Sequence, residues 1–276
     1  MSSMLKLSAT ALLLSSFLHA NDAKVSDFLK KSFSQNPNIV KLDVTIADKS
    51  KVDALKGWEA YIVKIDATIK AQNEEKNVSQ KMIWFSNGDL ITQDLVDMKT
   101  GTSLKESIVP TFKAEFYDKA NLIYGSPDAK HKVAIFSDPL CPFCKSFVPK
   151  AIEDMKKDPK KFAIYYYHFP LASLHPAAVA LTKAAIAAEL QGRKDVVLDL
   201  YKVQVDARES DIQKILDAFN KTLGTKITPA DITNPEVLKH FNFGLNVADE
   251  MMVQGTPSVF FDGKADKSKT MYKKVQ

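Results

Sequence analysis

The two cysteines of the chain, Cys141 and Cys144, stand in the stretch SDPLCPFCK of residues 137–145. Apolar residues at helical spacing follow them, so the sequence predicts a helix that Cys141 opens. The free N–H groups and the positive dipole at a helix N-terminus favour the thiolate form of a cysteine placed there. Cys144, one turn on, lies on the same helix face and can attack a mixed disulfide. We therefore expect thiol–disulfide exchange, with Cys141 as an exposed nucleophile and Cys144 as a more buried resolving thiol.

The neighbours of the cysteines fit this chemistry. Pro142 fixes the backbone in the first turn, where its missing N–H costs nothing, and Phe143 offers an exposed apolar contact. A second stretch, Gly255-Thr256-Pro257, precedes a predicted strand. We expect a cis bond before Pro257, with the backbone of Thr256 beside Cys141, ready to pair with an extended substrate segment.

Two other uses of a cysteine pair carry less support. A structural zinc site takes four ligands, and of the four histidines after residue 20 only His168 and His175 are close in sequence. A chain of this length buries a core without a structural disulfide. The sequence thus favours a redox-active Cys141–Cys144 disulfide, with no metal and no cofactor.

The first twenty residues predict a secretory signal. Lys6 is followed by the apolar stretch 7–18 and by Ala20, the expected cleavage point. That stretch is too short to span a bilayer, and no later segment is long and apolar enough. We expect the mature protein outside the cytoplasm. The net charge of +5 is spread along the chain, which argues against a nucleic-acid partner.

Residues 21–100 predict a small domain made of a helix and an antiparallel sheet. A helical spacing covers residues 25–33, and strand patterns cover 40–46, 61–69, 80–85 and 90–96. Asn87-Gly88 is a hairpin signal, and residues 73–76 predict a polar turn. Asn77 fits an N-glycosylation acceptor, although the sequence favours a plain polar turn. Such a sheet has edge strands, which a second copy of the chain would cover.

Residues 101–122 predict a helical linker kinked at Pro110, and residues 123–276 an α+β catalytic domain. Strands are expected at 133–136, 162–169 and 258–261, and the helices after Cys141 at 175–190, 195–205, 211–223 and 235–252. A strand, a helix opened by Cys-x-x-Cys, a strand, a helical block and then Thr-Pro before a strand is the order of the thioredoxin fold. The helical insertion spans about residues 172–250.

The stretch of residues 138–145, together with Gly255-Thr256-Pro257, resembles the periplasmic disulfide isomerase family of DsbC and DsbG, and is closest to DsbG. The resemblance implies a periplasmic homodimer joined through cystatin-like N-terminal domains, with Cys141 attacking, Cys144 resolving and Thr256-Pro257 as the cis-proline loop. Its partners would be unfolded or misoxidised secreted proteins and a membrane redox protein. The second, structural cysteine pair of DsbC is absent here.

Four functions stay open at this point. The first is a disulfide isomerase or reductase, kept reduced by a DsbD-like membrane donor. The second is a dimeric oxidase, kept oxidised by a DsbB-like partner, since Pro142-Phe143 also resembles the dipeptides of oxidising members. The third is a holdase chaperone with secondary redox activity, and the fourth a carrier that reduces specific partners.

Overall fold

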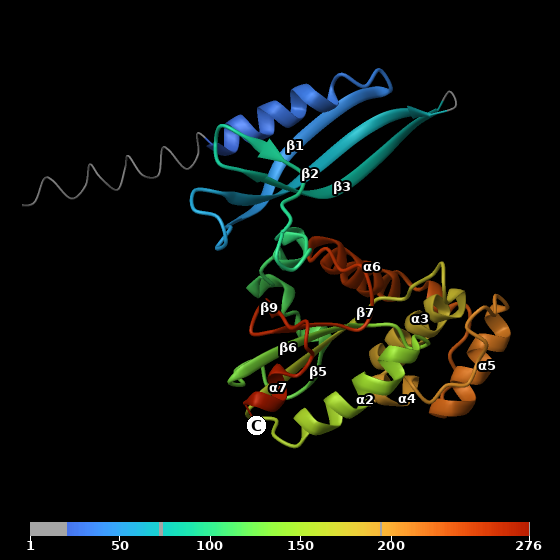
Figure 1. Cartoon of the computed structure of the whole chain (residues 1–276). Helices are drawn as coiled ribbons and strands as arrows, with labels where there is room; N and C mark the ends of the chain where they lie inside the picture. Colours follow the sequence, from blue (N-terminus) through green and yellow to red (C-terminus); the bar gives the residue numbers. More distant parts are fainter. Residues whose placement is uncertain (1–20, 72–73, 194, 276) are drawn as a thin grey trace, which may run out of the picture. The chain divides into compact units, whose positions relative to one another are not determined.

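The computed structural model describes residues 21–71, 74–193 and 195–275 (Figure 1). The predicted signal of residues 1–20 lies outside these ranges. The chain divides between Ile108 and Val109 into two compact units, and each unit has hydrophobic clusters of its own. The two units are described separately below.

The first unit is a helix over residues 21–33 on a four-stranded antiparallel sheet. The strands follow chain order, namely β1 (Ile39–Lys51), β2 (Glu59–Ala71), β3 (Glu74–Ser86) and β4 (Ile91–Thr92). Val25 and Leu29 of the helix join Val44, Tyr61 and Val63 of the sheet in one core cluster. The prediction of a helix with an antiparallel sheet is confirmed.

Two details of this sheet differ from the prediction. β4 has two residues instead of the expected 90–96, because Asp94 turns the chain and Thr92 Oγ1 donates to its carbonyl oxygen (3.1 Å). Residues 74–76, which were predicted to lie in a polar turn, belong to β3, because the pairing of β3 with β2 extends to Glu74. Asn77 therefore lies in a strand, where Thr68 Oγ1 donates to its side-chain oxygen (2.8 Å).

The predicted helical linker over residues 101–122, kinked at Pro110, contains no α-helix. The segment contains three separate 3-10 turns, η1 (Leu104–Ser107), η2 (Ala114–Phe116) and η3 (Lys119–Asn121). Its second half is anchored to the second unit, because Phe112 and Phe116 pack into the core of that unit and Phe112 N donates to Gly263 O (2.9 Å). Tertiary packing of aromatic residues thus overrides the helical pattern.

The second unit is built on a five-stranded sheet of order β5-β7-β6-β8-β9. β6 and β7 are parallel, and the other pairs are antiparallel. The strands are β5 (Leu122–Tyr124), β6 (His131–Ser137), β7 (Phe162–His168), β8 (Ser258–Phe261) and β9 (Lys264–Ala265). β6, β7 and β8 confirm the predicted strands, whereas the short edge strands β5 and β9 were not predicted.

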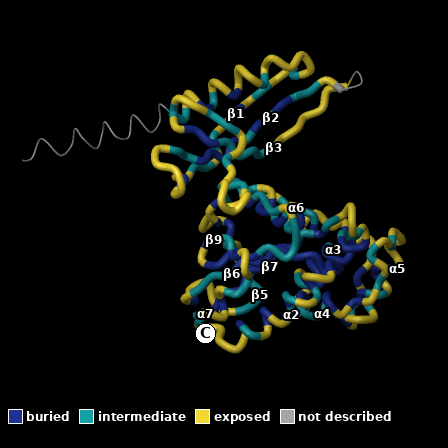
Figure 2. Tube along the Cα trace, in the orientation of Figure 1, coloured by how far each residue is buried: buried dark blue, intermediate teal, exposed yellow. Residues whose placement is uncertain are grey.

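Both faces of this sheet are covered, as the buried strands in Figure 2 show. On one face Ile135, Ile164 and Tyr166 share a core cluster with α2 (Pro142–Lys156). On the other face Phe136 and Tyr167 share a cluster with α6 (Pro235–Glu250). β7 is therefore buried along its whole length, and β6 and β7 form a rigid support from which α2 begins.

The helical insertion lies between β7 and β8 and consists of α3 (Pro176–Leu190), α4 (Val196–Leu200), α5 (Ile212–Leu223), the turn η4 (Asp231–Thr233) and α6. α4 is shorter than the predicted 195–205, and Asp195 stands before it in the left-handed region (φ 58°). α7 (Met271–Lys274) ends the described chain.

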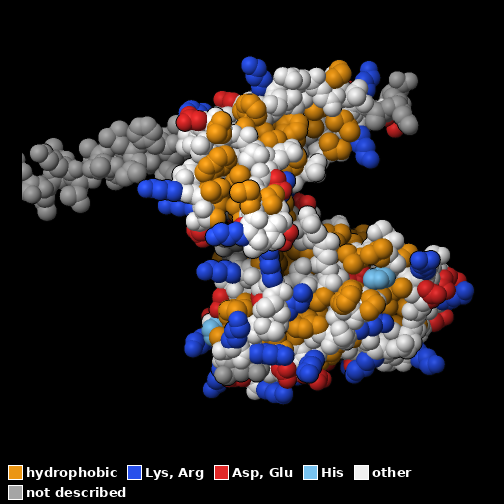
Figure 3. Space-filling model, in the orientation of Figure 1, with side chains coloured by type: hydrophobic (Ala, Val, Ile, Leu, Met, Phe, Trp, Pro, Cys, Tyr) orange, Lys and Arg blue, Asp and Glu red, His pale blue; other side chains and the backbone are white. Residues whose placement is uncertain are grey.

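Basic and acidic side chains are interspersed on the face shown in Figure 3. Within the described ranges, no helix combines the length and the apolar character needed to cross a membrane.

Candidate redox site

The cysteine pair sits at the start of α2, as predicted. Cys141 is the N-cap residue with extended backbone (φ −65°, ψ 123°), Pro142 is the first helical residue, and Cys144 lies within the first turn. Both cysteines are free thiols. Cys144 is fully buried, and Phe143 exposes 75% of its surface. The expected burial of Cys144 and exposure of Phe143 are thus confirmed.

The expected exposure of Cys141 is wrong, because only 5% of its surface is accessible. Its Sγ lies 3.6 Å from the carbonyl oxygen of Thr256, so the loop before β8 approaches the sulfur. The Thr256–Pro257 bond is cis, and Ser258 Oγ donates to Gly255 O (2.7 Å) within the same loop. The sequence therefore identified the two segments that meet, but not how closely the loop approaches the sulfur.

The environment of Cys144 makes it a poor acid. Burial raises the pKa of its thiol to about 11. The nearby Ser137 hydroxyl and the backbone at Asp138 act in the opposite direction, while the charge of Cys141 adds to the rise. Burial has the largest effect, so Cys144 is held as a thiol, and the Ser137 hydroxyl reduces the rise in part.

A chain of buried hydroxyl groups continues from Ser137 into the core. Ser137 Oγ lies 2.6 Å from the Tyr201 hydroxyl, which lies 2.8 Å from the Tyr166 hydroxyl. Burial raises the pKa of both tyrosines, so they remain neutral donors. Either hydroxyl of each pair can donate, and in the arrangement where Tyr201 donates to Ser137 the Ser137 proton can point at the Cys144 sulfur. Sequence reasoning missed this chain.

The carboxylate of Asp138 holds the loop before the cysteines. It is fully buried, and one oxygen accepts the backbone N–H groups of Leu140 (2.7 Å) and Cys141 (3.2 Å). The other accepts from Leu171 N (2.7 Å) and contacts His175 Nδ1 (2.9 Å). Asp138 therefore connects the Cys141 loop to His175, the N-cap residue of α3.

The sequence indicated part of the role of Asp138, namely its hydrogen bonds to the loop that follows it. Aspartate before a turn commonly accepts backbone N–H groups two and three residues further on, and Asp138 does so. His175 was considered above only as a metal ligand. Its contact with Asp138 spans 37 residues, so sequence spacing gave no indication of it.

Comparison with known proteins bears mainly on the second unit. The family model described as Thioredoxin matches residues 118–276. The chain is similar to the Na(+)/H(+) antiporter NhaA 1 of Mycolicibacterium gilvum, with 31% identity over 144 residues, which are 51% of this chain and 23% of that protein. The protein of the same name from Mycolicibacterium vanbaalenii is 27% identical over 143 residues, again 51% of this chain and 23% of the relative. These curated relatives are thus matched over less than a quarter of their length.

Solved structures give weaker likenesses. BdbD from Bacillus subtilis is 17% identical, with a TM-score of 0.47 and coverage of 61% of this chain and 93% of BdbD. ScsC from Proteus mirabilis, in a transitional conformation, is 22% identical, with a TM-score of 0.46 and coverage of 58% of this chain and 71% of ScsC.

Proposed function

Because this chain belongs to the thioredoxin family, we propose that it is a thiol:disulfide oxidoreductase whose second unit exchanges disulfides through Cys141 and Cys144. The observation that carries the proposal is the meeting of three features at one point. Cys141 caps the N-terminus of α2, Cys144 lies in the first turn on the same helix, and the carbonyl oxygen of Thr256 faces the Cys141 sulfur. A metal site or a static cross-link requires no such loop.

The proposed reaction proceeds in two exchanges. The Cys141 thiolate attacks one sulfur of a substrate disulfide, and the other substrate sulfur leaves as a thiolate that takes up a proton. Cys144 then loses its proton and attacks the Sγ of Cys141. The second substrate sulfur leaves, so the substrate gains two electrons and the enzyme holds a Cys141–Cys144 disulfide. A polypeptide substrate would lie extended along Thr256 and contact the exposed ring of Phe143.

For isomerisation the second exchange is delayed. The substrate stays joined to Cys141 while its own thiols attack the mixed disulfide and form a new pairing, which returns Cys141 as a thiolate. The high pKa of Cys144 is compatible with this course, because a resolving thiol that ionises rarely gives the substrate time to rearrange. We favour a disulfide isomerase or reductase because residues 138–145 and Gly255-Thr256-Pro257 resemble those of DsbC and DsbG.

The proposed setting follows the resemblance to DsbC and DsbG. The protein would act in the periplasm on unfolded or misoxidised secreted proteins, kept reduced by a DsbD-like membrane donor. The first unit would join two copies of the chain. β1 is a 13-residue edge strand on which Val40 is 55% exposed, and an edge of this kind favours pairing with another strand.

A second candidate is a disulfide-introducing oxidase, which Pro142-Phe143 supports through its likeness to oxidising members. The two candidates differ in the resting state of Cys141 and Cys144. Thiol trapping in cells would find the pair reduced in an isomerase and oxidised in an oxidase that a DsbB-like partner serves.

The test of the proposed chemistry uses the two cysteines separately. Cys141→Ser is expected to abolish insulin reduction, because the remaining Cys144 is fully buried. Cys144→Ser is expected to accumulate mixed disulfides with substrates, since attack proceeds and release fails. Substantial insulin reduction by the Cys141 variant would contradict the assignment.

A further inference from the structure

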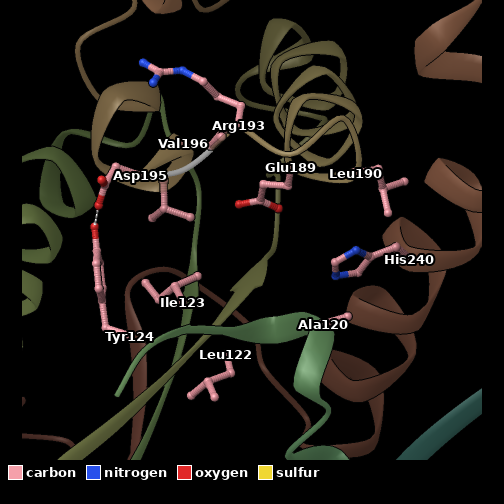
Figure 4. Close-up of a pocket in the computed structure, with 11 residues that line it drawn as sticks. Ala120, Leu122, Ile123, Tyr124, Glu189, Leu190, Arg193, Asp195, Val196 and His240 are labelled. Carbon is pink, nitrogen blue, oxygen red and sulfur yellow. Dashed lines mark hydrogen bonds between the residues drawn. The ribbon is translucent and has the colours of Figure 1, made fainter. Parts of the chain in front are cut away.

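A cavity of about 430 Å³ lies in the second unit, away from the cysteines. It is formed by η3 and β5, the end of α3, α4 and α6 (Figure 4). Tyr124 and Asp195 line it, and Lys156 at the end of α2 bonds to both, at 3.1 Å in each case. Because Cys141 stands at the other end of this 15-residue helix, about 20 Å separate the cavity from the redox site.

The cavity combines apolar walls with two polar side chains. Leu122, Ile123 and Val196 provide apolar surface, and Glu189 and His240 project into the space from α3 and α6 (Figure 4). Among the described residues, neither side chain makes a hydrogen bond or a salt bridge. A volume of this size with few convergent polar groups is typical of small-molecule sites.

The carboxyl of Glu189 is half-buried at the cavity. Its surroundings raise its pKa to about 7, so the folded protein carries a carboxyl that resists ionisation near neutral pH. Groups with a pKa shifted in this way are concentrated at functional sites. A cation bound beside the carboxyl favours its ionised form.

The charges around the cavity favour a cation over an anion. Arg193 is bonded to Asp199 (3.0 Å) and points away from the cavity in Figure 4. Asp195 is occupied by Lys156 and Tyr124. Burial lowers the pKa of His240, so its ring is neutral at pH 7 and offers a nitrogen acceptor. Glu189 and His240 can thus both accept hydrogen bonds from one bound donor.

We propose that this cavity binds a primary alkylammonium group, whose N–H groups bond to Glu189 and His240 and whose alkyl chain packs on Leu122, Ile123 and Val196. A free alkylamine and the side chain of a lysine in a polypeptide both carry this chemistry. A metal ion fits less well, because within residues 21–71, 74–193 and 195–275 no three His, Cys, Asp or Glu side chains are placed to hold one.

The experiment is calorimetric titration of the reduced protein with n-hexylamine, n-hexanol and n-hexanoate, which share a chain and differ in head group. At pH 8 the amine is expected to bind at least about tenfold more tightly than the other two, the effect of one charge-assisted hydrogen bond. Nα-acetyl-lysine methylamide tests the polypeptide source. If it binds and hexylamine does not, the ammonium comes from a lysine.

Glu189→Gln is expected to weaken binding of the amine about tenfold or more. The matched control Glu153→Gln removes an exposed carboxyl of α2 and should leave binding unchanged. Both variants should keep full insulin-reducing activity, since neither residue touches the cysteines. Equal binding of hexylamine and hexanol to the wild type would overturn the proposal, as would equal amine binding by Glu189→Gln or the absence of binding by every amine.

The pH dependence gives a separate readout. The groups facing Glu189 are His240 from α6, Tyr124 from β5, and Arg193 and Asp195 after α3. Asp195 has a lowered pKa through Tyr124 and Lys156, and Tyr124 a raised one through burial. The pKa of about 7 places the charge change of Glu189 between pH 6 and 8. Amine binding should be about tenfold weaker at pH 6 than at pH 8. A flat profile would contradict the role of Glu189.

Discussion

Replacement of Ser137 by alanine is expected to slow the resolving step selectively. The Ser137 hydroxyl lies beside the Cys144 thiol and lowers its pKa, against the larger effect of burial. Tyr201 lies 2.6 Å from that hydroxyl. In Ser137→Ala the thiolate of Cys144 loses the stabilisation that this hydroxyl can give.

The magnitude follows from the pKa of about 11. At pH 7 roughly one molecule in 10⁴ carries the Cys144 thiolate. A hydrogen bond to a charged group contributes about 1.5–3 kcal/mol, which corresponds to about one to two pKa units. The thiolate fraction at fixed pH should therefore fall about 10- to 100-fold, and the resolving rate about 4- to 16-fold, because a thiolate of higher pKa is a stronger nucleophile. The repulsion from a charged Cys141 is absent once that sulfur is in a mixed disulfide, so it does not enter the comparison.

The assay follows the two thiol releases when the reduced protein reacts with an aromatic disulfide such as Ellman's reagent. The first release reports attack by Cys141 and should be unchanged. The second reports attack by Cys144, and its rate should rise about tenfold per pH unit up to the pKa of that thiol. Ser210→Ala, an exposed serine before α5, is the control. Equal second-phase rates in wild type and Ser137→Ala would refute the role given to the hydroxyl chain.

Two further predictions concern the rest of the chain. Deletion of residues 21–108 should leave a folded monomer that still reduces insulin, because the second unit has its own core. The rate at which this monomer refolds proteins with scrambled disulfides should be lower than that of the intact protein. Sedimentation that shows the intact protein to be monomeric would contradict the proposed dimer. Glu189→Gln should raise the unfolding free energy at pH 8, since the folded pKa of about 7 exceeds the ordinary value of 4.5. This gain should decrease as the pH falls from 7 and vanish below 4.5, where the wild-type carboxyl is protonated in both states; urea titrations at several pH values measure it.

The sequence determined the parts of the redox site that depend on local chemistry. Cys141, Pro142 and Cys144 lie where the helical spacing and the first-turn proline require, at the start of α2. Thr256 and Pro257 enter a strand through a cis bond as predicted. The order of the main strands and helices was also readable, because periodicity and turn residues act within a few positions of the chain.

Tertiary structure decided what surrounds these residues. The low exposure of Cys141 comes from a loop 115 residues away, and the Asp138–His175 contact joins the Cys141 loop to the helical insertion. The 3-10 turns between residues 101 and 122 replace the predicted helix because Phe112 and Phe116 are anchored in the second core. None of these features has a period or a spacing that sequence reading could use.

The hydroxyl groups of Ser137, Tyr201 and Tyr166 show most clearly what the sequence determines and what only the tertiary structure decides. The sequence supplies Ser137, Tyr166 and Tyr201 as ordinary residues of two strands and a helix end. Only the packing of β6 beside β7, with the end of α4 against them, brings the three hydroxyls within hydrogen-bonding distance. Burial raises the pKa of the Cys144 thiol in the same core, because desolvation is a property of the packed core and not of any single residue.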